Sequence, residues 1–143
     1  MSDKPKVQVL MCDGAMLVGG KWTLQGVFDR INFHSALPAT KSPFFIFFRI
    51  TDIFIKQGSS LLLEIRKNFL EEAGEDNLPI FRGTLDFEID KQGQQTLARR
   101  TNFEFAMPIG PTRYEKPGVY DIAFFVDNEF VDVWTFRVNE PAT

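Results

Sequence analysis

The sequence has one cysteine, Cys12, and one histidine, His34. A single cysteine excludes a disulfide within the chain, which is typical of proteins in the reducing cytosol. A zinc site of the usual kind needs several nitrogen or sulfur ligands, and these two residues are too few to supply it. They form a candidate Cys–His catalytic pair, but a small buried thiol and a solvated loop histidine would explain them equally well.

The sequence also lacks long apolar runs, a basic stripe and catalytic motifs. No segment approaches the roughly 20 apolar residues of a membrane-spanning helix, and no apolar stretch follows the polar N-terminus as in a signal peptide. The formal net charge is −3, with both signs interspersed, which disfavours nucleic acid as a partner. Neither a Gly-x-Ser-x-Gly motif nor a phosphate-binding glycine loop occurs. We therefore expect a cytoplasmic protein without a cofactor that binds neither nucleic acid nor membranes.

Phenylalanine is abundant, with 16 copies among 143 residues. This length suits one domain spanning residues 1–143, with flexible tails at 1–5 and 140–143. So many flat, stiff side chains indicate a thick core between two sheets, or an apolar surface that a partner covers.

Alternation of apolar and polar residues predicts about eight strands, the last two forming a hairpin over 118–138 with its turn at Asp127, Asn128 and Glu129. The six earlier strands are expected at 7–12, 22–33, 44–52, 61–66, 80–90 and 98–107. Asp13-Gly14 reads as a turn, and Gly26 as a bulge or a close backbone approach. Leu62, Glu64 and Arg66 should form the solvent-exposed face of their strand. Residues 69–73 could form a single helical turn.

These strands, joined by loops too short for crossover helices, predict an all-β fold. Our first choice is an antiparallel β-sandwich of the immunoglobulin-like or jelly-roll-like type, and a barrel is the alternative. The bulky residues of the final hairpin, Trp134 included, are expected to face the core.

Both ends of the chain resemble a family of small uncharacterised bacterial all-β proteins, catalogued as a domain of unknown function. The opening carries Cys12-Asp13, Gly20-Lys21 and, over 24–31, Leu-x-Gly-Val-Phe-Asp-Arg-Ile; the closing carries Pro117-Gly118-Val119-Tyr120 and Val126-Asp127. The resemblance leaves the middle of the chain unmatched. It implies a single all-β domain and supplies no catalytic residues.

Pro-Gly-x-Tyr before a late strand is also similar to the tyrosine corner of immunoglobulin-like domains. By that analogy, the hydroxyl of Tyr120 bonds to backbone across a loop.

Two groups of carboxylates could carry chemistry. Asp86, Glu88 and Asp90 line one strand face and could include a sugar-cleaving pair, although a solvated face has the same spacing. Asp127, Asn128 and Glu129 could bind calcium through oxygen, although turn chemistry explains Asp-Asn by itself.

Three phenylalanines, Phe45, Phe47 and Phe125, lie opposite the expected core and are candidate interface residues. The leading hypothesis is a non-catalytic module that binds protein, either another protein or itself as a homodimer. A carbohydrate- or calcium-binding module is the alternative, and the sugar-binding form would need an exposed Trp or Tyr. An enzyme that uses Cys12 and His34 or surface carboxylates is the third possibility.

Overall fold

The computed structural model describes residues 6–56, 58–67, 78–86 and 98–141. These residues form eleven strands and no helix, so the all-β prediction is confirmed. The additional strands, relative to the eight expected, are three-residue segments too short to show a periodicity. The strands are β1 (Lys6–Val18), β2 (Lys21–Phe28), β3 (Arg30–Asn32), β4 (Ala39–Lys41), β5 (Phe44–Lys56), β6 (Ser60–Lys67), β7 (Phe81–Asp86), β8 (Ala98–Ile109), β9 (Thr112–Tyr114), β10 (Gly118–Val126) and β11 (Glu129–Asn139).

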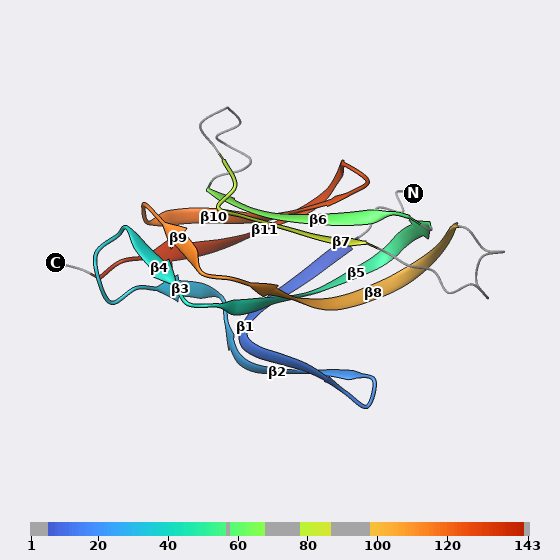
Figure 1. Cartoon of the computed structure of the whole chain (residues 1–143), viewed down its shortest axis with the longest axis horizontal. Helices are drawn as coiled ribbons and strands as arrows, with labels where there is room; N and C mark the ends of the chain where they lie inside the picture. The colour runs from blue at the N-terminus through green and yellow to red at the C-terminus, as the bar shows by residue number, and fades with distance from the viewer. Residues whose placement is uncertain (1–5, 57, 68–77, 87–97, 142–143) are drawn as a thin grey trace.

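Two sheets face each other as two layers (Figure 1). The first has the strand order β2-β1-β5-β8 and the second has β3-β11-β10-β6-β7, while β4 and β9 form a separate short pair. The core lies between the sheets, because alternate residues of both are buried in one cluster. Its largest fully buried members include Phe44, Phe48, Phe124 and Tyr114.

The expected hairpin over 118–138 lies at the centre of the second sheet. Its first strand, β10, is flanked by β11 and β6. Asp127 and Asn128 form the turn with φ of 50° and 68°, the left-handed pair that two-residue hairpin loops of type I′ require. The register shifts between Phe124 and Phe125, which marks a bulge near the turn.

The antiparallel prediction is wrong at one pair. Strand β3 runs parallel to β11, with Arg30 opposite Arg137. The predicted strand over 22–33 is split here, because the chain leaves the first sheet after Phe28 and joins the second at Arg30. A strand that reaches a sheet from another sheet can run parallel to its neighbour, whereas a tight hairpin imposes the antiparallel direction.

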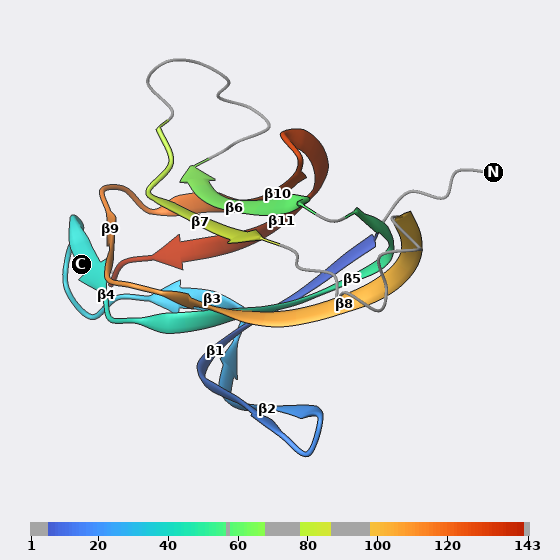
Figure 2. The same cartoon turned by 45° about the vertical axis from the view of Figure 1, so that its right-hand side comes forward.

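Asp13-Gly14 is not a turn, contrary to the prediction. Strand β1 continues through both residues, and Gly14 lies opposite Gln25 in the ladder with β2. The turn comes at Gly19-Gly20, where φ is 56° and 76°. Strand β5 pairs with β1 only as far as Cys12, which lies opposite Val27. Residues 13–26 therefore form a two-stranded hairpin, here called the arm, that projects from the body (Figure 2).

Gly26 sits in the arm at φ 65°. The pairs on either side of it, Val27 with Cys12 and Gln25 with Gly14, keep one register, so Gly26 is not a bulge. A close approach is present, although by a side chain and not by backbone: a Cβ on Gly26 would lie 2.4 Å from Asp13 Oδ2.

Candidate functional site

Cys12 and His34 lie in different surroundings. Cys12 is fully buried, and burial, reinforced by the charge of Asp13, raises the pKa of its thiol. His34 is exposed in a loop and lines a hollow with Asp13, Thr40 and Lys41, to which Cys12 does not contribute. A protonated, inaccessible thiol is a poor nucleophile.

Asp127 has a structural role. Its Oδ1 accepts a hydrogen bond from the Ser60 backbone N–H, and its Oδ2 accepts one from Ser59 Oγ, both at 3.0 Å. Both carboxylate oxygens are therefore engaged in joining the β10–β11 turn to the start of β6. Within the described residues, no cluster of three His, Cys, Asp or Glu side chains could hold a metal ion.

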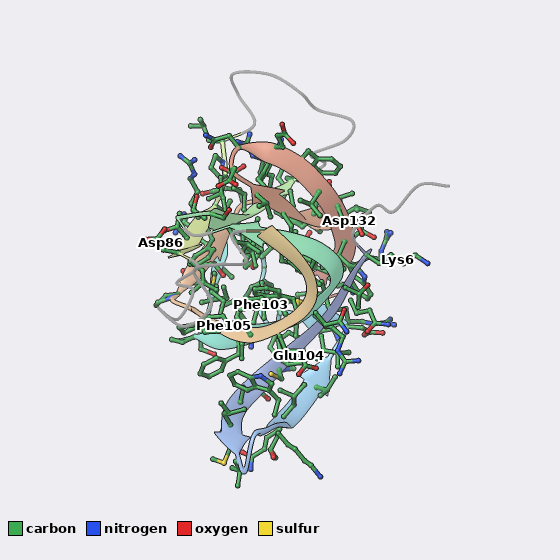
Figure 3. All side chains as sticks on the ribbon, turned by 90° about the vertical axis from the view of Figure 1, so that its right-hand side faces the viewer. Lys6, Asp86, Phe103, Glu104, Phe105 and Asp132 are labelled. Carbon is green, nitrogen blue, oxygen red and sulfur yellow. The ribbon has the colours of Figure 1, made fainter. Side chains whose placement is uncertain are left out.

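Of the carboxylates predicted on one strand face, Asp86 is exposed at the end of β7 and points outward (Figure 3). Glu88 and Asp90 lie outside the described residues, as do Phe87 and the predicted helical turn at 69–73. In the described part of β7, side chains alternate between half-buried and exposed, as the sequence predicted.

The candidate interface residues lie on different sheets and are half-buried. Phe45 and Phe47 belong to β5 in the first sheet, while Phe125 belongs to β10 in the second. The Phe47 ring lies 6.0 Å from the ring of Trp22, which the arm carries, and Phe125 lies 5.9 Å from Phe130 across the hairpin. The chain itself thus covers part of these rings.

A buried carboxylate was not predicted from the sequence. Glu64 is only 3% exposed, although the alternation placed it on a wet face. Its Oε1 lies 3.0 Å from Arg66 Nε and its Oε2 lies 2.8 Å from Arg82 Nε. Two guanidinium groups thus pair with the Glu64 carboxylate on β6, next to β7, and the strand pairing that brings in Arg82 is not visible in local sequence.

Strands β1 and β2 carry most of the exposed large apolar side chains. Among the described residues, eight large hydrophobic side chains are exposed, and five of them, namely Leu10, Met16, Leu17, Val18 and Val27, are on β1 and β2. We call Met16, Leu17 and Val18 the tip. Each tip side chain is more than half exposed, at 52%, 58% and 56%.

A shallow apolar hollow lies where the arm leaves the body. It is lined by Val9, Leu10, Met11, Val27, Phe28, Asp29 and Trp134, has a volume of about 340 Å³, and is called the root groove below. Trp134 lies opposite the buried Ile122, on the core-facing side of β11 as predicted, but it is 37% exposed, so the prediction that it is buried in the core is wrong. The reason is that β1 and β2 diverge from β11 here, and the hollow between them leaves one side of the indole uncovered.

Charged groups surround the other side of Trp134. A second hollow of about 410 Å³ shares Trp134 and Asp29 with the root groove and adds Arg30 and Arg137. Arg30 Nε donates to Asp29 Oδ1 at 3.0 Å. This hydrogen bond, helped by the charge of Arg30, lowers the pKa of Asp29, so the carboxylate is anionic at neutral pH.

A comparison with known proteins identifies a family but no activity. The protein-family model described as "Family of unknown function (DUF6941)" matches residues 8–139. No curated protein matches the chain. Among the described residues, no helix is long and apolar enough to cross a membrane.

Proposed function

The chain belongs to this family of unknown function, and from its geometry we propose that it is a non-catalytic, cytoplasmic interaction module that associates with copies of itself through the arm. The observation that carries the proposal is the concentration of exposed apolar side chains on β1 and β2. Scattered apolar residues are normal on a protein surface, but exposed apolar side chains that gather on one projecting element are typical of an interaction site.

The free edge of β2 supports the same proposal. In the described residues β2 pairs only with β1, so its other edge offers unpaired backbone groups. Natural edge strands are usually protected by charges, prolines or bulges. Strand β2 has only Lys21 as a charged residue and contains no proline. An unprotected edge beside apolar side chains favours association with another polypeptide.

We also propose that the two facing sheets form a β-sandwich of the immunoglobulin-like or jelly-roll-like type. The Tyr120 hydroxyl donates a hydrogen bond to the backbone carbonyl of Lys116 at 2.6 Å, as the analogy with a tyrosine corner predicted. This bond favours the immunoglobulin-like form. Such folds serve many functions, so the fold does not by itself support an activity.

Light scattering over a concentration series tests the proposed function. We expect the wild-type chain to exceed the mass of a monomer, and Leu17→Glu to return it to a monomer because a carboxylate would enter the apolar contact. Thr84→Glu is the matched control, because Thr84 is an exposed polar residue of β7, which belongs to the second sheet and does not pair with the arm. A wild-type chain that stays monomeric throughout the series contradicts the proposal.

The exposure of Trp134 favours a second candidate, carbohydrate binding. A half-covered indole between apolar residues and the Asp29–Arg30 pair offers both a flat apolar face and hydrogen-bonding groups. The chain has two tryptophans, so Trp22→Phe leaves Trp134 as the sole tryptophan, whose emission can be excited selectively. Emission that does not change across a panel of glycans removes this candidate.

A further inference from the structure

Resting on the proposed self-association, we infer that the tip of the arm of one copy docks into the root groove of a second copy. The partner is therefore another molecule of this chain, and the contact joins two different patches. The tip offers three exposed apolar side chains, and the root groove offers an apolar hollow beside a half-exposed indole. Burial of the tip removes both surfaces from water.

A molecule cannot fill its own root groove with its own tip. Both features belong to the same pair of antiparallel strands, at opposite ends of the arm. Val27 lies opposite Cys12 at the root, whereas Lys21 lies opposite Val18 at the tip. These pairs are six residues apart, which corresponds to about 20 Å along a strand. The occupant of the root groove must therefore come from another molecule.

The charges of the two patches are complementary. Lys21 closes the tip beside Val18. Asp29 is the one charged residue among those that line the root groove, and its exposed carboxylate forms an ion pair with Arg30 that an incoming ammonium group would share. An ammonium group that arrives with the tip meets this carboxylate at the rim, which favours one orientation of the docked arm.

The symmetry of the assembly follows from this contact. Tip and root groove are different surfaces, so each copy can donate one and accept another. Such heterologous contacts close into a ring or continue as an open chain. A two-fold dimer formed by two β2 edges is the competing arrangement, in which each copy contributes the same surface.

Complementation between two variants separates these arrangements. Leu17→Glu damages the tip, and Val27→Glu damages the root groove at a side chain that is 54% exposed. Each substitution should weaken self-association at least about tenfold, because it places a carboxylate in an apolar contact. Mixed in equal amounts, the two variants should form a 1:1 dimer, since one keeps an intact tip and the other an intact root groove. Native mass spectrometry detects this dimer, and Thr84→Glu should assemble as the wild type does.

Fluorescence provides a second measurement that does not depend on the groove variant. In the Trp22→Phe protein, emission of Trp134 should shift to shorter wavelength with increasing concentration, and adding Leu17→Glu should abolish the shift. If the wild type assembles but the mixed variants remain monomers and the emission does not shift, the inference is overturned and a two-fold contact is favoured. A monomeric wild type overturns the proposed function itself.

Discussion

Asp127 and Ser60 hold each other through two reciprocal hydrogen bonds. The Asp127 backbone N–H donates to the Ser60 carbonyl, and the Ser60 N–H donates to Asp127 Oδ1, each at 3.0 Å. These bonds join the β10–β11 turn to the start of β6, and Asp127 also has a left-handed φ of 50°.

Replacing Asp127 should destabilise the protein. Asp127→Ala removes both side-chain hydrogen bonds and places a residue with a Cβ but no local hydrogen bond in the left-handed region, so we expect a loss of about 2–3 kcal/mol. Denaturant unfolding measures this loss. Asn128→Gly is the control, because Asn128 has φ 68° and glycine adopts this conformation without strain. Equal stability of Asp127→Ala and wild type would show that the bonds contribute nothing.

Gly26→Ala should cost about 1–2 kcal/mol, because its φ is 65° and the added methyl group would lie 2.4 Å from Asp13 Oδ2. Adding Asp13→Ala should recover only part of this loss, since the backbone strain remains. Gly110→Ala is the matched control: a Cβ added there would meet no atom within 4 Å beyond its chain neighbours, and its stability should be unchanged or higher. Thermal unfolding compares the three proteins, and an equal effect at both glycines would contradict this account.

Glu64→Ala should lower the free energy of unfolding by about 3 kcal/mol. It removes the buried carboxylate that pairs with Arg66, whose side chain is only 25% exposed. Arg82→Ala should cost less than about 1 kcal/mol, since the Arg82 side chain is 63% exposed and its charge is well hydrated. The control is Glu115→Ala, which removes a surface pair with Arg113. Urea unfolding ranks the variants, and a neutral Glu64→Ala would mean that the buried carboxylate is dispensable.

Stability should decrease at alkaline pH. Burial raises the pKa of Tyr114 to about 12, against an ordinary value of 10.0, while the hydrogen bond from Thr112 opposes this shift. Between these values the unfolded chain loses the phenolic proton and the folded chain keeps it, so the unfolded state binds fewer protons. The contribution of the protonated Tyr114 to the free energy of unfolding is fully present below pH 10, and it should fall by roughly 2–3 kcal/mol towards pH 12.

Unfolding by urea at a series of pH values checks this alkaline loss. Tyr114→Phe provides the comparison, because it lacks the titrating group and should show a weaker decrease. An identical pH profile for both proteins would contradict the assignment to Tyr114.

Cys12 should be unreactive in the folded protein. Its thiol is buried and its pKa is raised, chiefly by desolvation, so both access and thiolate formation are suppressed. A thiol reagent should therefore modify Cys12 only when denaturant unfolds the chain. Rapid modification of the native protein at neutral pH would revive the Cys12–His34 hypothesis.

Several features of the fold follow from neighbouring residues and could be read from the sequence. Asp127-Asn128 tolerate the left-handed backbone, so the turn of the last hairpin was predictable. The Pro-Gly-x-Tyr segment predicted the hydrogen bond of Tyr120. The alternation in β7 predicted its two faces. In each case the cause lies within a few residues along the chain.

Other features required the arrangement of the sheets. Alternation placed Trp134 inside and Glu64 outside, yet Trp134 borders a hollow and Glu64 is buried between two arginines. Asp13-Gly14 looked like a turn, but pairing with β2 keeps both residues in a strand. Local pattern reports which side of a strand a residue occupies, and it does not report what covers that side.

The sequence by itself thus determined that the chain is all-β, where its principal hairpin turns, and which residues alternate, because these depend on local backbone preferences and on a period of two. Only the tertiary structure decided that residues 13–26 project as an arm, that β3 joins β11 in parallel, and that Trp134 lies beside an apolar hollow. Those features arise from contacts between segments far apart in the chain. The way the two sheets pack decides which residues cover each strand face.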